Sequence, residues 1–419
     1  MTKVYAMRFF PGLKCLCGGV SSYISRKVSP VCGRLWAGQW MRSCSRTSQI
    51  MKEGNQDSIM LKHLISKIKS TGPISVAEYM REVLTNPVTG YYQHRDVLGP
   101  QGDFITSPEI SQIFGELLGV WCISEWMAAG KPKTFQLVEL GPGRGTLASD
   151  ALRVFSQLNS VLKESEISVH LVEVSPKLGE VQAQLLTEGE QHLRHDPNAA
   201  IYKTGTTKTG LPISWYKDLQ DVPRGFSFYI AHEFFDVLPI HKFQRDDERD
   251  HIEICPEAGI IVQNLASRIT EDGGAALIAD YGHNGTKTDT FRGFRGHQQH
   301  DVLTTPGTAD LTADVDFSYL RQMTKGKVTS LGPIPQHEFL KNMGIDVRLQ
   351  VLLRNTSDPA TSTGLIDAYD MIMNPEKMGN RFKFFALLPC DRLISSNDTR
   401  SKKHGPTAPP VAGFSELQL

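Results

Sequence analysis

The feature that most constrains this chain is the stretch VELGPGRG, where an apolar run ends in an acid and three glycines follow at alternate positions. The run belongs to residues 134–140, which have the composition of a buried strand. Near its end stand Glu139 and then Gly141, Gly143 and Gly145. Glycines this dense allow a sharp turn and the close approach of another molecule. A strand, a glycine turn and a following helix predict an α/β fold with a ligand at the turn.

The spacing of the glycines separates two kinds of ligand. A dinucleotide fingerprint reads GxGxxG, whereas this chain has GxGxG followed by Thr146, and it has no GK[ST] of a P-loop. A strand that ends in an acid and runs into GxGxG resembles motif I of class I S-adenosylmethionine methyltransferases. Glu139 can then meet the ammonium of the methionine part or order the loop around it. The three glycines leave room beside the backbone.

A second acid supports a nucleoside-type cofactor. Glu173 ends the next apolar stretch, residues 167–174, where a carboxylate can accept hydrogen bonds from both ribose hydroxyls. An NAD-binding turn is disfavoured by the missing third fingerprint glycine, and a ligand-free glycine turn remains the alternative. Asp218 follows the stretch PISWY and is a candidate for an adenine contact; a solvated loop is the alternative.

The remaining pattern predicts a parallel sheet with helices on both faces, because strands alternate with helices. Expected strands cover 225–236, 274–282 and 381–389, and expected helices cover 57–70, 75–84, 107–130, 257–269 and 336–344, with another from Pro176. Asp57 or Ser58 is the expected cap of the first helix, and Ser107 that of the third. Residues 283–330 read as loop-rich, and the tail from Ser395 reads as disordered.

The first 50 residues differ in composition from the rest of the chain. They contain no Asp or Glu, many serines, and eight basic residues, namely Lys3, Arg8, Lys14, Arg26, Lys27, Arg34, Arg42 and Arg46. This composition is typical of a mitochondrial transit peptide, with cleavage expected within 40–55. No window reaches the ~18 apolar residues of a membrane span. The sequence therefore predicts a mitochondrial matrix protein without stable membrane insertion.

Cysteine and histidine give no support for a metal site. Four of the seven cysteines lie in the expected leader, and Cys122, Cys255 and Cys390 are far apart with no CxxC pair. His297 and His300 are three residues apart, but no third ligand is evident. We therefore expect no metal.

The candidates for chemistry lie in IAHEFFDVLP, at the end of the strand expected over 225–236. His232, Glu233 and Asp236 should face the crevice at the carboxyl edge of the sheet. If the substrate is an arginine, carboxylates can clamp its guanidinium, and His232 could act as a base. Capping of the following turn by Glu233 or Asp236, and a purely structural His232, remain alternatives. Asp280 could line the same crevice or hold a turn.

An acid-rich segment over 305–320 contains Asp310, Asp314 and Asp316. It could attract a basic substrate segment through its charge. A solvated loop with capping acids is the alternative. The sequence shows no basic patch interleaved with aromatics, and we expect no nucleic-acid partner.

Five motifs in order give a more specific resemblance. They are GYYQHRDVLGPQGDFITSPEISQIFGE, VELGPGRGTL, HEFFDVLP, DYG followed by DTFRGF, and PGTADLTADVDF. Together they resemble the MidA-like family, and especially its mitochondrial protein arginine methyltransferases that assist complex I assembly. The resemblance covers about 57–394. It implies a class I S-adenosylmethionine-dependent fold and symmetric dimethylation of an arginine on an iron-sulfur core subunit of complex I.

The resemblance also implies a domain plan: a transit peptide over 1–46, a helical N-terminal region with a substrate-side loop over 57–133, a methyltransferase domain over 134–394 and a disordered tail over 395–419. One departure from the family follows Gln244, where HKFQ runs directly into RDDERDHIEIC. The family normally continues there with a Trp-x-Glu segment and further strand residues, so we expect an internal deletion after Gln244. HKFQ and HIEI can still form a hairpin. A non-catalytic complex I assembly chaperone that keeps the fold is the second hypothesis.

Overall fold

The computed structural model describes residues 3–4, 46–94, 99, 102–103, 105–188, 194–196, 199–244, 251–393 and 410–415, and the side chains of the first helix from Ile59 onward. Most of the expected transit peptide, 1–46, lies outside the described residues, and so does the expected cleavage region before Arg46. In the described part of the chain no helix is long and apolar enough to cross a bilayer.

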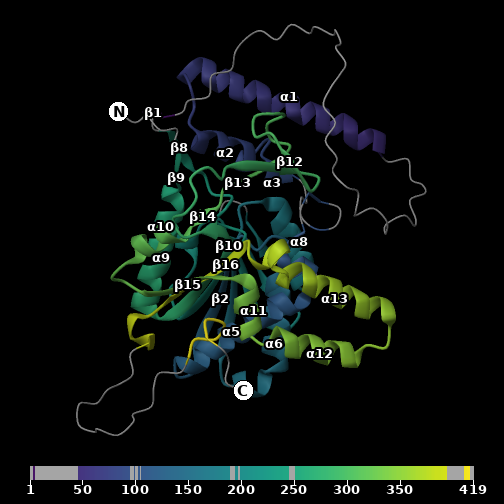
Figure 1. Cartoon of the computed structure of the whole chain (residues 1–419), viewed down its shortest axis with the longest axis vertical. Helices are drawn as coiled ribbons and strands as arrows, with labels where there is room; N and C mark the ends of the chain where they lie inside the picture. The colour runs from purple at the N-terminus through teal and green to yellow at the C-terminus, as the bar shows by residue number, and fades with distance from the viewer. Residues whose placement is uncertain are drawn as a thin grey trace.

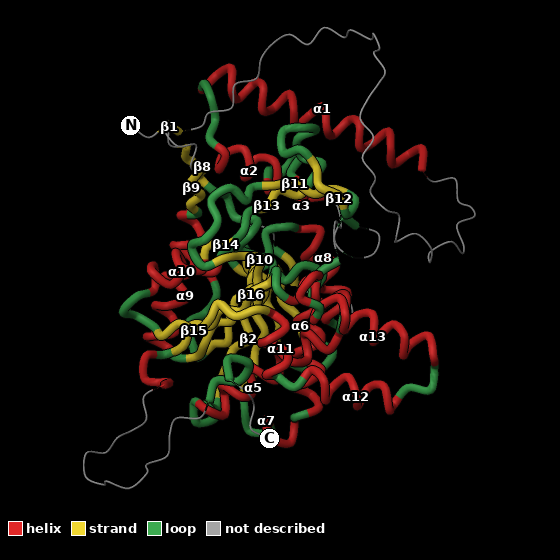
Figure 2. The backbone as a smooth tube through the Cα atoms, viewed as in Figure 1, coloured by secondary structure: helices red, strands yellow, loops and turns green. Residues whose placement is uncertain are grey.

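A ten-stranded sheet forms the centre of the molecule (Figures 1 and 2). Five neighbouring strands are parallel, in the order β10 (Gly274–His283), β7 (Ser227–His232), β2 (Thr134–Leu140), β3 (Glu166–Val172) and β6 (Pro212–Tyr216). The chain runs outward from β2 through β3 to β6 and then returns to β7 on the other side of β2. The strand order therefore reverses between β2 and β7, which is where open α/β sheets bind ligands.

The edges of the sheet are antiparallel, which the sequence pattern did not predict. On one side β16 (Phe382–Leu388) lies antiparallel between β10 and β15 (Thr329–Pro335), while β14 (Val315–Asp316) pairs with the end of β10. On the other side β5 (Ile201–Thr206) and β4 (Arg194–His195) continue antiparallel from β6. The fold is thus a class I methyltransferase-like α/β sheet with mixed edges.

Helices cover both faces of the sheet. One core contains side chains of α5 (Gln112–Ala128), α6 (Thr146–Gln157), α8 (Pro176–Leu186) and α11 (Gln336–Asn342), and the short α7 (Asn159–Leu162) follows α6. The opposite core contains α9 (Pro256–Asp272) and α10 (Phe317–Thr324), beside the single turn η2 (Leu219–Asp221). The strand side chains alternate between the two cores, as expected for a sheet buried on both faces.

The N-terminal region sits over the carboxyl edge of the sheet (Figure 1). A third core joins α1 (Arg46–Thr71), α2 (Val76–Thr85) and α3 (Tyr91–His94) to β13 (Asp310–Thr312). Ser75 and Glu78 form a capping box at the start of α2. The expected cap of α1 at Asp57 or Ser58 is wrong, because the helix begins at Arg46.

The long helix expected over 107–130 is divided. Glu109 accepts hydrogen bonds from the backbone N–H and the hydroxyl of Thr106, so Thr106 rather than Ser107 caps α4 (Ser107–Ile110). Ser111 then adopts an extended conformation, with φ −146° and ψ 119°, and α5 begins at Gln112. The break turns Ser107 and Glu109 toward the carboxyl edge of the sheet.

Two small sheets lie around this edge. The hairpin expected from HKFQ and HIEI is confirmed as β8 (His241–Gln244) and β9 (His251–Ile254), with β1 (Lys3–Val4) beside β8; the charged turn between β8 and β9 lies outside the described residues. The stretch expected to be loop-rich over 283–330 contains β11 (Arg292–Arg295), β12 (Gln298–His300), β13, β14 and α10. That expectation was therefore too simple.

Two helices after α11 were missed from the sequence. They are α12 (Ile345–Asn355) and α13 (Pro359–Met373), followed by a π-helical turn, η3 (Pro375–Gly379). Figure 1 shows them extending away from the sheet.

The tail expected to be disordered contains an ordered segment, 410–415. Val411 and Ala412 are buried in the same core as α5 and α6, and Phe414 packs edge-on against Phe339 of α11. Asn342 donates a hydrogen bond to the carbonyl of Gly413. The Ser, Lys and Pro composition around 395–409 concealed these few apolar residues.

Gly413→Ala tests whether this segment stabilises the protein. Gly413 has φ 80°, and a Cβ there would lie 2.2 Å from Phe339 Cε2. Gly210→Ala is the matched control, since Gly210 has φ 82° with nothing within 4 Å of its Cβ position. Both variants carry the left-handed strain of about 1–2 kcal/mol, but only Gly413→Ala also clashes. We expect Gly413→Ala to lower the melting temperature by about 2–4 °C more than the control and to speed chymotryptic cleavage near Phe414. Equal melting temperatures and cleavage rates would show that the segment is not docked.

Candidate active site

The principal cavity opens at the carboxyl ends of β2, β3, β7 and β10, at the point where the strand order reverses. Its volume is about 2130 Å³. The glycine turn and the ends of β2 and β3 form one part of its wall; the turn after β7 and strands β10 and β13 form another. Nine site residues were predicted from the sequence, and all but Gly145 border this cavity. These eight are Glu139, Gly141, Gly143, Glu173, Asp218, His232, Glu233 and Asp236.

The glycine turn has the conformation that the sequence pattern predicts. Gly141, Gly143 and Gly145 have φ 62°, 54° and 85°, a region that residues with a side chain rarely adopt. At Gly141 a Cβ would lie 2.7 Å from the ring of Phe234. Gly145 lies just behind the cavity wall, where it begins α6 in a left-handed conformation. The turn therefore brings backbone, rather than side chains, to the cavity.

Glu139 is a buried acid with an unpartnered oxygen. Its Oε2 has no hydrogen-bond partner, and the side chain is 3% exposed. Burial raises the pKa of Glu139 to about 8, although a hydrogen bond from the backbone N–H of Ala148 acts in the opposite direction. An acid held in this state is ready to accept a positively charged group.

Glu173 is held in place by its neighbours along the chain. Its Oε1 accepts the backbone N–H of Ser175 at 2.6 Å, and its Oε2 accepts the amide of Gln182 at 3.0 Å. Burial raises the pKa of Glu173 to about 7. The same Gln182 amide nitrogen donates to the carbonyl of Gly143 at 2.8 Å, and Trp215 donates to the amide oxygen of Gln182. Gln182, which the sequence did not indicate, thus joins the ends of β2, β3 and β6.

Asp218 caps a turn and borders the cavity, while its contact with adenine stays a prediction. It caps the η2 turn, because its Oδ1 accepts the backbone N–H of Gln220 at 2.8 Å, and its side chain also borders the cavity beside Lys217. Capping does not prevent the second oxygen from meeting a ligand.

The turn after β7 is strained and firmly held. Glu233 has φ 50°, which costs about 1–3 kcal/mol for a residue with a side chain. Asp280 Oδ2 accepts the backbone N–H groups of Phe234, Phe235 and Asp236 at 3.2, 2.9 and 3.3 Å. Asp280 is fully buried and does not border the cavity, so its role is to hold the turn.

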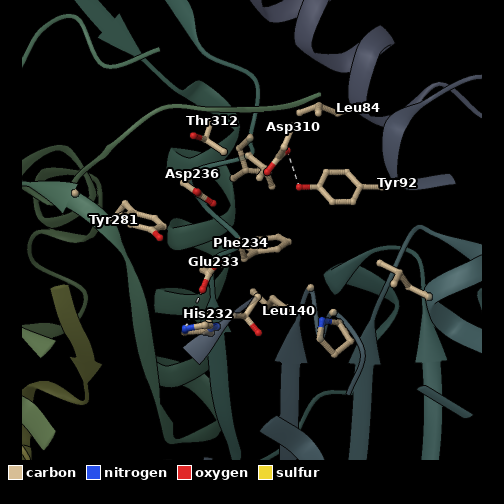
Figure 3. A pocket seen from close by; sticks show the side chains of 18 of the residues that line it. Leu84, Tyr92, Leu140, His232, Glu233, Phe234, Asp236, Tyr281, Asp310 and Thr312 are labelled. Atoms are coloured by element: carbon tan, nitrogen blue, oxygen red, sulfur yellow. Dashed lines mark hydrogen bonds and ion pairs between the residues drawn. The ribbon is translucent and has the colours of Figure 1, made fainter. Parts of the chain in front are cut away.

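This turn aims two carboxylates at the cavity, as Figure 3 shows. Glu233 Oε1 and Asp236 Oδ1 are buried without a hydrogen-bond partner. Asp310 from β13 faces them, and its Oδ1 accepts the hydroxyl of Tyr92 at 2.7 Å. Burial and the nearby acids raise the pKa of Glu233 and of Asp236 well above their usual range, and burial raises the pKa of Asp310 to about 6. The cluster is short of positive charge.

His232 supports this cluster from below. It is 7% exposed, stacks on Phe382 with an interplanar angle of 6°, and places Nε2 3.5 Å from Glu233 Oε1. Burial lowers the pKa of His232 to about 3. The imidazole is therefore neutral near pH 7 and a weak proton acceptor.

The other two acids that the sequence singled out in 305–320 form ion pairs at the cavity and cap a helix. Asp314 borders the cavity but pairs with Lys287 and with Arg292, whose Nη1 lies 2.6 Å from it. Asp316 caps α10 through the backbone N–H groups of Ser318 and Tyr319. Tyr92 and Tyr281 also border the cavity and were not singled out from the sequence.

The buried acids predict how stability depends on pH. The folded pKa of Glu173, about 7, and those of Glu139 and Asp280, about 8, lie above the ordinary carboxyl value of about 4. Folding therefore favours their protonated forms, and this stabilisation is lost progressively as pH rises from about 4 to the folded values of 7 to 8, above which no more is lost. His170 and His232, with lowered pKa values of about 4 and 3, affect stability only below about pH 6.5. We expect the ligand-free protein to lose stability from pH 6.5 to 8.5, measured by thermal unfolding.

Glu139→Gln isolates one of these groups. The amide resembles the protonated acid, so this variant should lack a slope of up to about 1.4 kcal/mol per pH unit. Glu166→Gln is the control, because that side chain is 71% exposed. Parallel pH profiles for wild type and Glu139→Gln would contradict the raised pKa of Glu139.

Comparison with known proteins agrees with this geometry. The chain is 58% identical to "Protein arginine methyltransferase NDUFAF7, mitochondrial" of Rattus norvegicus over 416 positions, covering 90% of this chain and 95% of the relative. It is 60% identical to the protein of that name from Danio rerio, over 90% of this chain and 96% of the relative. The alignment has 416 positions, which is more than 90% of the 419 residues of this chain. Some positions are therefore gaps in this chain, where the rat protein has residues with no counterpart.

A solved structure shares the fold. A superfamily member from Burkholderia thailandensis bound to S-adenosyl-homocysteine has a TM-score of 0.64 at 22% identity, over 80% of this chain and 93% of the other.

The family model "Putative S-adenosyl-L-methionine-dependent methyltransferase" matches residues 117–251 and 246–334, two segments that meet at the turn between β8 and β9. The residues around the cavity fit this cofactor. Glu139 offers an unpartnered oxygen to an ammonium, Glu173 offers a carboxylate to a ribose, and the glycine turn leaves backbone exposed between them. The chain belongs to the family of S-adenosyl-L-methionine-dependent methyltransferases that includes the mitochondrial protein arginine methyltransferase NDUFAF7.

Proposed function

We propose that this chain is a protein arginine methyltransferase of the mitochondrial matrix that symmetrically dimethylates an arginine of an iron-sulfur core subunit of complex I during assembly. The observation that carries the arginine substrate is the cluster of Glu233, Asp236 and Asp310, whose buried oxygens face the cavity without enough positive charge. The names of the relatives support the same substrate. The complex I subunit and the symmetric product rest on the family resemblance.

In this proposal the cofactor lies along the glycine turn. Glu139 meets its ammonium, Glu173 its ribose and Asp218 its adenine side, while Gly141 and Gly143 leave space for the methionine part and Gly145 allows the turn to enter α6. The bound cofactor supplies an electrophilic methyl group on a sulfonium. The contribution of the protein is placement, because a nucleophile must approach to about 3–3.5 Å in line with the departing sulfur.

Glu233 and Asp236 hold the incoming guanidinium and orient one of its nitrogens. A guanidinium in water is a delocalised cation with a pKa above about 12 and a poor nucleophile. Carboxylates paired with its other nitrogens draw the positive charge away from the attacking one and match its planar fork. Each transfer also releases a proton, and we assign Glu233, whose pKa is raised by burial, to accept it. We assign His232 to the support of Glu233, because its own pKa is too low for this task.

A second candidate function is a complex I assembly chaperone that keeps the fold without catalysis. The departure from the family pattern after Gln244 supports it, and the family match is divided at the same place, over 246–251. Strands β8 and β9 pair directly, with His251 opposite Gln244. The turn at Glu233, the glycine turn and Asp280 lie elsewhere in the fold, so we favour the enzyme.

Gly143→Val tests the cofactor site. Its φ of 54° strains any side chain, and a branched Cβ would enter the space proposed for the methionine part. Calorimetry with S-adenosylmethionine should show binding to the wild type and none to the variant. Gly210→Val is the control, because Gly210 has a similar φ of 82° in open space away from the cavity. Retained affinity in Gly143→Val would mean that the turn does not contact the cofactor.

Glu233→Gln separates catalysis from cofactor binding. After incubation of the purified complex I subunit with the chain and S-adenosylmethionine, mass spectrometry should find dimethylarginine with the wild type. We expect Glu233→Gln to reduce the rate by about 10²-fold or more with cofactor affinity unchanged. Glu166→Gln serves as the control, because that side chain is 71% exposed and does not border the cavity. Cofactor binding without methylarginine, under conditions in which the rat relative is active, would favour the chaperone.

A further inference from the structure

Helix α3 lies between the cofactor side and the acid cluster and bonds to both. The hydroxyl of Ser175 donates to the carbonyl of Tyr92 at 2.5 Å, and the hydroxyl of Tyr92 donates to Asp310 Oδ1 at 2.7 Å. The latter bond is drawn in Figure 3. Ser175 also donates its backbone N–H to Glu173 at 2.6 Å. An unbroken hydrogen-bonded path therefore runs from Glu173 through Ser175 and Tyr92 to Asp310.

We infer that Tyr92 is a positioning residue that orients Asp310 toward the substrate guanidinium and couples cofactor binding at Glu173 to guanidinium binding at Asp310. The inference rests on the proposed function and deepens it, since it assigns Asp310 to the substrate site and predicts cooperation between the two ligands.

The bonds of Ser175 explain how α3 can transmit a change. Tyr91, the neighbour of Tyr92, is 1% exposed and donates its hydroxyl to Asp103 Oδ2 at 2.7 Å, a bond that is not part of the path. Ser175 is the N-cap of α8 as well as the partner of Tyr92. Ribose hydroxyls that bind Glu173 change the bonds Glu173 makes to the backbone at Ser175, and Ser175 holds the carbonyl of Tyr92. When cofactor binding orders Glu173 and Ser175, less conformational entropy remains to be lost when Asp310 binds the guanidinium.

The charges around Asp310 make the hydroxyl bond important. The groups that face Asp310 are the carboxylates Glu233, Asp236 and Asp103 and the guanidinium of Arg292. Burial raises the pKa of Asp310 to about 6, and the hydrogen bond from Tyr92 is the largest of the influences that lower it. Without the hydroxyl, Asp310 would hold its proton to higher pH and bind a cation less well.

Tyr92→Phe and Tyr91→Phe form a matched pair of variants. Each removes one hydroxyl from α3, but only Tyr92 lies on the path to Asp310. The probe is Nα-acetyl-arginine amide, titrated by calorimetry into the full chain with and without saturating S-adenosyl-homocysteine. In the wild type and in Tyr91→Phe we expect the cofactor product to tighten probe binding at least about 5-fold. In Tyr92→Phe the effect should fall below about 2-fold.

The pH profile adds a readout that loss of stability alone would not move. With S-adenosyl-homocysteine present, probe binding should weaken below about pH 6 in the wild type, as Asp310 becomes protonated. In Tyr92→Phe this acid limb should shift upward by about half a pH unit or more, whereas Tyr91→Phe should keep the wild-type limb.

The outcomes separate the two proposals. If the wild type binds neither the arginine probe nor an arginine-containing peptide of the complex I subunit, the arginine substrate is wrong and this inference fails with it. If the wild type binds the probe but Tyr92→Phe retains both the cofactor effect and the pH limb, only the positioning role of Tyr92 is wrong. Binding without any cofactor effect in the wild type would likewise overturn the coupling alone.

Discussion

The bonds from Asp280 to the turn after β7 are the interaction on which the site depends. Glu233 occupies a left-handed conformation that a residue with a side chain avoids, and the turn could relax if nothing held it. One buried carboxylate oxygen gathers three successive N–H groups, from Phe234 to Asp236, and Glu233 itself donates its N–H to the carbonyl of Ala279. The strand pair β7 and β10 thus fixes a strained turn, and the strain aims the two carboxylates into the cavity.

The electrostatic state of the cavity follows from this arrangement. Carboxylates are normally buried only with a partner, yet Glu139, Glu233 and Asp236 each keep an oxygen without one. Their raised pKa values express the same imbalance, because the charged forms are disfavoured until a cation arrives. A sulfonium with an ammonium, followed by a guanidinium, would supply positive charge at both places. In the ligand-free protein these buried carboxyls therefore cost stability as the pH rises toward neutral.

The sequence predicted those parts of the site that depend on strand ends. Glu139 and Glu173 were placed correctly at the cavity because a parallel sheet brings its carboxyl ends to one edge, and the glycine spacing fixed the conformation of the turn. Residues that act through three-dimensional contacts gave no such signal. Gln182 joins three strand ends from the middle of a helix, and Tyr92 reaches Asp310 across 218 positions of sequence.

Local patterns also misled where tertiary contacts decided the outcome. Ser107 followed by Pro108 has the composition of a helix start, but Glu109 bonds back to Thr106 and the helix breaks at Ser111. The sequence suggested His232 as a base because an imidazole in water titrates near neutral pH, but burial lowers the pKa of His232 to about 3 and removes that capacity. The tail was read as disordered because its few apolar residues are outnumbered, although Val411 and its neighbours fill a gap in the core.

The hairpin of β8 and β9 is joined to the part of the fold that carries Asp310. Ile240, just before β8, is buried with α2 and with Leu311 of β13, so the start of the hairpin belongs to the core that carries Asp310. Farther out, Lys242 pairs with Asp289, and Glu253 accepts the N–H groups of Thr290 and Phe291. These bonds join the hairpin to the segment that leads into β11. These bonds of Lys242 and Glu253 do not depend on the length of the connection between Gln244 and His251. The hydrogen bonds that hold the turn after β7 and orient Asp310 are therefore made by residues outside the stretch between Gln244 and His251.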